Sequence, residues 1–131
     1  MTEAAILCVD DEIVILESIQ EQISRHFGDR FLYEAAESAE EALEIIEELN
    51  KEGVKILVIV SDWLMPGMRG DEFLVQVQQQ FGDITKIMLT GQADLEAIER
   101  AKREANLYSC IHKPWREEEL IEIMTTALKL A

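Results

Sequence analysis

The feature that most constrains this chain is an alternation of short apolar runs with longer amphipathic runs. The apolar runs are AAILCV (4–9), FLYEAA (31–36), ILVIVS (56–61), KIMLT (86–90) and YSCIH (108–112). Runs of this length are typical of buried β-strands, and strands covered on both faces favour a parallel sheet between helices. Because five βα units are too few for an eight-stranded barrel, the sequence predicts an open, doubly wound α/β sandwich of three layers with right-handed crossovers.

The amphipathic runs predict the helices and their inward faces. The first helix, which ends at Gly28, has an apolar stripe of Ile13, Leu16, Ile19 and Ile23. The second follows Ser38, which forms a capping-box pattern with Glu41, and runs to about Asn50. The third contains Phe73, Leu74 and Val77 and ends near Gly82. The fourth, 93–104, is expected to turn Leu95, Ile98 and Ala101 inward, and the fifth spans 117–130.

Composition limits the classes of protein to which the chain can belong. Its 131 residues, with 12 Lys plus Arg against 27 Asp plus Glu, suit a single domain over 1–131 with its core at about 4–130. A net charge of −15 argues against binding to nucleic acid or to an anionic membrane. No apolar run is long enough to span a bilayer and the first residues are not a basic leader, so we expect a cytoplasmic location. Cys8 and Cys110 are expected to be free thiols.

Chemically active side chains follow four of the predicted strands. Asp10 and Asp11 follow the first strand, Asp62 the third, Thr90 ends the fourth and Lys113 follows the fifth. In open parallel sheets, ligand sites lie at the carboxyl ends of the strands. Three carboxylates held close together would repel each other, and a divalent cation such as Mg²⁺ relieves that repulsion. The set therefore predicts a Mg²⁺ site at which a lysine and a hydroxyl meet an anion, as phosphoryl transfer to a carboxylate requires.

These residues lie in motifs that resemble the receiver domain of two-component response regulators, the chemotaxis-type, flavodoxin-like phosphoacceptor domain. The matching segments are CVDDE (8–12), VSDWLMPGMRGDEF (60–73), KIMLTG (86–91) and IHKPW (111–115). The resemblance implies a sheet with strand order 2-1-3-4-5. It also implies a signalling domain, not an enzyme acting on a separate substrate, that takes a phosphoryl group from a histidine kinase or phosphotransfer protein and later hydrolyses its own aspartyl phosphate.

The resemblance assigns a role to each matching residue. Asp62 is the phosphoacceptor, and Mg²⁺ (or Mn²⁺) is bound by Asp62, directly by Asp11, mainly through water by Asp10, and by the backbone carbonyl of Leu64. Thr90 is the switch hydroxyl. Lys113 pairs with the phosphoryl group, and its bond to Pro114 is expected to be cis. The fourth helix, the fifth strand and the fifth helix are expected to rearrange on phosphorylation.

Three positions depart from the family pattern. Cys110 stands where receivers usually carry an aromatic switch residue, so that coupling is either absent or taken over by Tyr108 on the same strand face. The two positions that tune the lifetime of the phosphoryl group are Leu64 and Gln92. Leu64 cannot orient an attacking water, and Gln92 carries no charge. We therefore predict a longer-lived phosphoryl group than in fast chemotaxis-type receivers.

Other interpretations are weaker but distinct. A haloacid-dehalogenase-type phosphatase would need an acid where Leu64 stands, and a flavodoxin would need a phosphate-binding loop where the chain has Asp10 and Asp11. A phosphorylation-independent pseudo-receiver remains open because of Cys110.

No output domain follows Leu130, so either the domain acts alone or it belongs to a longer parent protein. A weak homodimer through the fourth helix, fifth strand and fifth helix could pair Arg100 and Arg103 with acids such as Glu118 and Glu122.

Overall fold

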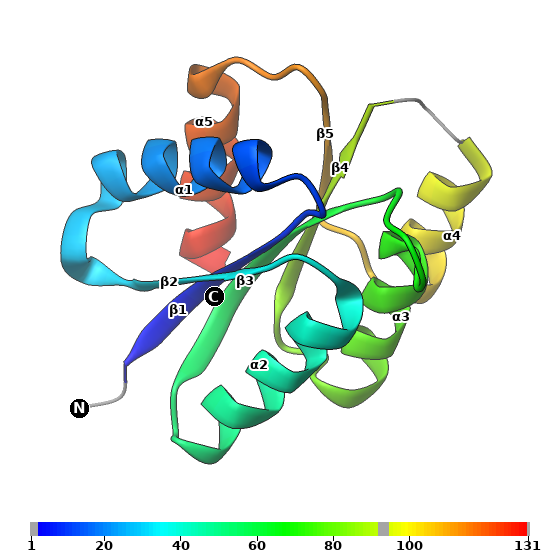
Figure 1. Ribbon diagram of the computed structural model, residues 1–131, viewed down its shortest axis with the longest axis horizontal. Coiled ribbons are helices and arrows are strands. Elements are labelled where there is room, and N and C mark those ends of the chain that lie inside the picture. The colour runs from blue at the N-terminus through cyan, green and yellow to red at the C-terminus, as the bar shows by residue number, and fades with distance from the viewer. Residues whose placement is uncertain (1–2, 92–94, 131) are drawn as a thin grey trace.

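The computed structural model describes residues 3–91 and 95–130, which form a parallel sheet between two layers of helices (Figure 1). The strands are β1 (Ala4–Val9), β2 (Leu32–Ala36), β3 (Lys55–Asp62), β4 (Thr85–Thr90) and β5 (Ser109–His112). The helices are α1 (Ile13–Phe27), α2 (Ala39–Lys51), α3 (Gly70–Gln80), α4 (Leu95–Glu104) and α5 (Glu117–Leu130), with a short 3₁₀ turn, η1, at Gly28–Arg30. The doubly wound three-layer fold predicted from the sequence is confirmed.

The sheet has the order β2-β1-β3-β4-β5 with parallel neighbours throughout, as the resemblance implied. Its register brings the strand ends together, since Val9 pairs with Ser61, Asp62 with Leu89, and Thr90 with His112. The residues that follow β1, β3 and β5 therefore emerge at one edge of the sheet, which is the geometry that a shared site needs.

Each face of the sheet has its own core. α1 and α5 cover one face (Figure 1) and pack Ile19, Ile23, Leu120 and Met124 onto the strands. α2, α3 and α4 cover the other face with side chains such as Ile46, Phe73, Leu74, Val77 and Ala101. We call these the α1–α5 core and the α2–α4 core. Cys8 lies in the first and Cys110 packs against the second, and both are free thiols.

Two residues expected to point inward are exposed instead. Ile13 is 54 % exposed and Leu95 is 71 % exposed, whereas Leu16 and Ile98 one turn later are buried. Each exposed residue is the first of its helix. A helix that follows a parallel strand begins beyond the edge of the sheet, so its first turn has no strand surface to pack against. The start of the fourth helix, predicted at Ala93, lies outside the described residues.

The predicted capping box is only half formed. Ser38 Oγ accepts a hydrogen bond from the Glu41 backbone N–H at 3.1 Å, which satisfies one unpaired donor in the first turn of α2. The Glu41 carboxylate accepts from the backbone N–H of Glu37 at 3.4 Å rather than from that of Ser38.

In the part of the chain that the structure describes, no helix combines the length and the apolar character needed to cross a bilayer.

Candidate functional site

Three carboxylates meet at the carboxyl edge of the sheet. Asp10 and Asp62 are buried and Asp11 is exposed, and one oxygen from each lies within 4.8 Å of the others. Backbone groups fix Asp10, since its N–H donates to Ala36 O at 3.1 Å and its side chain accepts from the Glu12 N–H at 2.9 Å. The cluster predicted from the strand ends is therefore present as a set of converging side chains.

Lys113 supplies the positive charge of the cluster. Its Nζ lies 2.8 Å from Asp10 Oδ2 and 3.0 Å from Asp62 Oδ1, so one ammonium group bridges the two buried acids. Burial lowers the pKa of Lys113, but hydrogen bonds to Asp10 and Asp62 and their negative charges outweigh it and leave that pKa raised. Its backbone N–H donates to Thr90 O at 2.8 Å, and the Lys113–Pro114 peptide bond is cis.

Asp62 is the carboxylate with the most perturbed environment. Burial raises the pKa of Asp62 to about 6, and the charges of Asp10 and Asp11 add to the rise, while Lys113 opposes it. At neutral pH the group is mostly ionised, although it sits in a place that disfavours charge. A carboxylate held in this state is poorly solvated and has a strong affinity for positive charge.

The loop after Asp62 is held tightly against the end of β3. The Trp63 N–H donates to Leu89 O at 2.8 Å, and the Gly70 N–H donates to Trp63 O at 2.7 Å. A Cβ atom at Gly70 would lie 1.9 Å from Asp62 O, so this position admits only glycine. Leu64, two residues beyond Asp62, is 62 % exposed.

The predicted switch positions are only partly described. Thr90 is buried at the end of β4. Cys110 is half-buried in β5 and contacts the α2–α4 core, where burial raises the pKa of its thiol and the Lys102 charge lowers it in part. Tyr108 precedes β5 and is 36 % exposed. Gln92 lies outside the described residues.

Comparison with known proteins identifies the family. The model of the response regulator receiver domain matches residues 6–125. This chain belongs to the receiver domain family. A crystal structure of the signal receiver domain of an HD domain-containing protein from Pseudomonas fluorescens Pf-5 is 29 % identical, with a TM-score of 0.85 over 98 % of this chain and 96 % of that one. A CheY-like receiver domain protein from Methanospirillum hungatei JF-1 is 28 % identical, with a TM-score of 0.84 over 98 % and 95 %.

Curated relatives of this receiver domain are longer proteins. The hydrogenase transcriptional regulatory protein HoxA of Cupriavidus necator is 32 % identical over 127 residues, which are 97 % of this chain but 24 % of HoxA. The chain thus spans about a quarter of the length of that relative. It is a receiver domain of two-component response regulators, and hence a signalling domain.

The donor set of the receiver site fits a divalent cation. Its three carboxylates offer hard oxygen ligands within 4.8 Å of one another, and the charge of Lys113 offsets only one of the three negative charges. Mg²⁺ prefers such ligands and retains several waters, which the exposure of Asp11 allows. A bound divalent cation would therefore offset negative charge that Lys113 leaves uncompensated.

Sequence reasoning did not assign a role to Asp71 or to Lys86, which are both buried. Asp71 stands three residues before Leu74 on the inward stripe of α3, and an acid on an apolar stripe is the signal that could have revealed it. Lys86 interrupts the apolar character of β4 in the same way.

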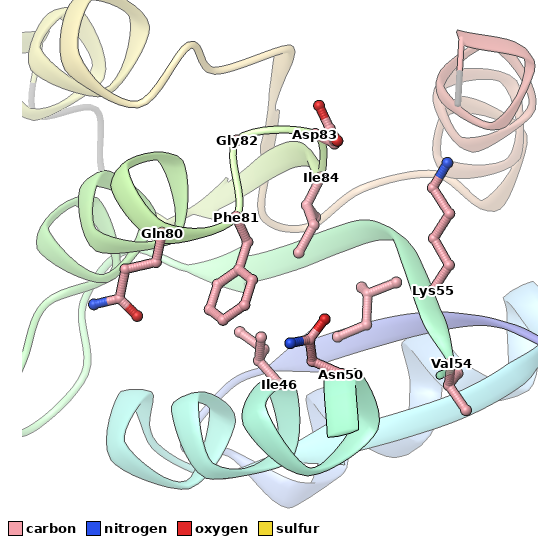
Figure 2. A pocket seen from close by; sticks show the side chains of 10 residues that line it. Ile46, Asn50, Val54, Lys55, Gln80, Phe81, Gly82, Asp83 and Ile84 are labelled. Carbon is pink, nitrogen blue, oxygen red and sulfur yellow. The ribbon is translucent and has the colours of Figure 1, made fainter. Parts of the chain in front are cut away.

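A separate hollow of about 310 Å³ lies at the opposite edge of the sheet (Figure 2). Ile46, Phe81 and Ile84 point into it beside Asn50, and Ile56 also lines it. None of the carboxylates of the site lines it. The hollow is therefore distinct from the chemistry at the carboxyl edge.

Proposed function

We propose that Asp62 accepts a phosphoryl group from a histidine kinase or a phosphotransfer protein and that the resulting aspartyl phosphate switches the domain. The observation that carries the proposal is the bridge from Lys113 Nζ to Asp10 and Asp62 beside three converging carboxylates. An ionised Asp62 is a competent nucleophile, and the ammonium of Lys113 lies 3.0 Å from its Oδ1.

The reaction needs few protein groups. A carboxylate oxygen of Asp62 forms a bond to phosphorus while the bond from phosphorus to the donor's histidine nitrogen breaks, and that histidine leaves. Lys113 would balance negative charge on the phosphoryl oxygens, and Thr90, buried at the end of β4, would donate a hydrogen bond to one of them. Asp10, Asp11, Asp62 and the Leu64 carbonyl would hold Mg²⁺ (or Mn²⁺), which would supply further charge neutralisation. Hydrolysis by water restores the carboxylate and releases inorganic phosphate.

We further propose that residues 1–131 act as one signalling unit and that α4, β5 and α5 carry its output. The relatives include response regulators and hybrid kinases, which supports a kinase partner and an output domain in a longer parent protein. A weak homodimer through this surface would depend on Arg103 more than on Arg100, because Arg100 is already paired with Glu104 at 2.6 Å within α4. We expect neither nucleic acid nor membrane as a direct partner.

Tryptophan fluorescence tests the phosphoacceptor site, because Trp63 adjoins Asp62. The protein is titrated with Mg²⁺ and then with beryllofluoride or acetyl phosphate, and adducts are counted by intact mass. We expect a saturable, Mg²⁺-dependent change that disappears in Asp62→Ala. Asp83→Ala, which removes an exposed carboxylate from the opposite edge of the sheet, serves as the matched control and should respond like the wild type. A wild type with no response and no adduct would favour the pseudo-receiver instead.

The lifetime of the phosphoryl group is a further prediction. An exposed, apolar Leu64 leaves an attacking water without a hydrogen-bonding partner at that position. Leu64→Asn should therefore shorten the half-life about fivefold, the rate equivalent of one hydrogen bond, and Leu64→Met should leave it unchanged. The decay is measured by quenching after removal of the phosphodonor. A wild-type half-life of seconds would contradict the argument.

A further inference from the structure

A buried carboxylate in the first turn of α3 has no role in the phosphoacceptor chemistry. Asp71 is fully buried, on a helix that also buries the apolar side chains of Phe73 and Leu74. Burying a carboxylate is unfavourable unless it is paired, and Asp71 is paired through one oxygen only. Its Oδ2 lies 3.2 Å from Arg69 Nη2 and 3.7 Å from Arg100 Nη1, while Oδ1 has no hydrogen-bond partner among the described residues. The group is therefore held by ionic contacts that can be rearranged.

One of those contacts comes from α4, which lies beside α3 (Figure 1). Arg100 Nε lies 2.6 Å from Glu104 Oε2, one turn along its own helix, and the rest of the guanidinium reaches Asp71 in α3. Arg100 is thus shared between a partner that moves with α4 and a partner that does not. A displacement of α4 relative to α3 would lengthen the contact with Asp71 and leave that with Glu104 intact.

The start of α3 is in turn fixed to the phosphoacceptor. Asp71 follows Gly70, whose N–H donates to Trp63 O and whose Cα packs directly on Asp62 O. Space at this contact is too small for a methyl group, so the first turn of α3 cannot shift independently of the end of β3. Arg100 and Asp71 consequently connect α4 to the backbone of Asp62 without passing through β5.

We infer that Asp71 and Arg100 form a latch that holds α4 against α3 in a resting arrangement. The latch sets how readily phosphorylation at Asp62 moves α4. The inference rests on the proposed function. It gives the domain a connection from the site to α4 that does not need an aromatic ring at Cys110. Asp71 and Arg100 are positioning residues that act on α4, and neither touches the phosphoryl group.

Weakening the latch is expected to tighten the binding of beryllofluoride. A ligand that favours the switched arrangement of α4 binds more tightly when the resting arrangement is destabilised. Its affinity rises by the same factor by which the equilibrium shifts toward the switched arrangement. Arg100→Gln and Asp71→Asn should therefore tighten the apparent affinity for beryllofluoride, in the presence of Mg²⁺, by about two- to fivefold, the range of a partly exposed ion pair. The double variant should match either single variant, because both remove the same contact.

Trp fluorescence titration measures these affinities, with two control variants. Glu104→Gln removes the other partner of Arg100 but keeps the contact with Asp71, and Arg103→Gln removes a charge of the same sign from the same helix. Both should bind beryllofluoride as the wild type does. Asp71→Asn keeps the shape of the side chain, and thermal melting checks that each variant is folded. In ligand-free protein, hydrogen exchange in α4 should be faster in Arg100→Gln and Asp71→Asn than in either control.

The outcomes separate the latch from the function on which it rests. Tighter binding and faster exchange confined to the two latch variants would support the inference. Unchanged affinity in Arg100→Gln and Asp71→Asn, beside a normal wild-type response, would overturn the latch alone, whatever the exchange rates. Additive effects in the double variant would overturn it as well. A wild type that fails to respond to beryllofluoride would defeat the proposed function and the latch together.

Discussion

On the α1–α5 side of the sheet the indole N–H of Trp115 is paired, whereas the α2–α4 side buries the charged groups Asp71 and Lys86 and, among the described residues, polar atoms without a hydrogen-bond partner. Trp115 packs against the first core, and its Nε1 donates to Gln22 Oε1 at 2.9 Å. Trp63 packs against the second, and its Nε1 is buried without a hydrogen-bond partner among the described residues. Asp71 is also buried on the second side.

Lys86 is a further buried charge on the α2–α4 side of the sheet. Strand alternation places it on the side of Met88, in the α2–α4 core, where its Nζ donates to Ile84 O at 2.5 Å. Burial lowers the pKa of Lys86, and the charge of Asp83 raises it in part. Apolar packing settles into one close-packed arrangement, while buried polar groups with exchangeable partners allow more than one. We therefore expect the α1–α5 side to be the rigid half of the domain and the α2–α4 side to be the half that changes conformation.

The largest expected effect on stability is at Gly70, where the start of α3, on the α2–α4 side, contacts the phosphoacceptor site. Gly70→Ala would force a Cβ into Asp62 O, so we expect a loss of about 3 kcal/mol or more in the free energy of unfolding, with loss of phosphoacceptor function. Urea unfolding measures the change. Gly91→Ala is the matched control, since among the described residues a Cβ there meets no atom within 4 Å outside its own chain neighbours, and it should be nearly neutral. Equal losses in the two variants would refute the tight contact.

An intermediate effect is expected from removal of the buried charge at Asp62. Its pKa is raised from 3.8 to about 6, so the native state binds a proton more readily than the unfolded chain, and ionisation destabilises the fold above pH 6. In Mg²⁺-free buffer at pH 8, Asp62→Asn should gain about 1–3 kcal/mol in the free energy of unfolding.

The pH dependence makes this prediction specific. The gain should shrink as the pH falls from 6 towards 4 and be lost below about pH 4, where the carboxyl becomes protonated in both states. Glu47→Gln, an exposed acid on α2, should show no such gain. A gain that persists unchanged at pH 4 would mean that burial of charge at Asp62 is not its cause.

The smallest effect compares the two tryptophans directly. Trp115→Phe breaks a hydrogen bond that Trp63→Phe does not, while both variants lose similar apolar area. We expect Trp115→Phe to cost about 1 kcal/mol more than Trp63→Phe in the free energy of unfolding. Urea unfolding followed by circular dichroism avoids dependence on the deleted fluorophore. Equal costs would remove one basis for calling the two sides different.

Much of the fold was predictable because apolar runs and caps are local signals. The boundaries of β1 and α5 were predicted at Ala4–Val9 and Glu117–Leu130, where the structure has them. The convergence of Asp10, Asp62 and Lys113 was also predictable, since parallel strands must end at one edge. The inward stripes were wrong at Ile13 and Leu95, because periodicity says which face a residue occupies but not whether a strand lies beneath it.

The sequence by itself determined the five βα units, the parallel sheet and the polar residues that follow its strands, because each depends on the chemistry of neighbouring residues. Tertiary structure alone decided which polar side chains become buried and which partners they find. Asp71 meets Arg100, 29 positions away along the chain, only because α3 and α4 pack side by side. Asp62 acquires its raised pKa only because folding removes water from it and brings Asp10 and Asp11 close, against the opposing charge of Lys113. Burial and long-range charge contacts are properties of the packed assembly, and no local pattern encodes them.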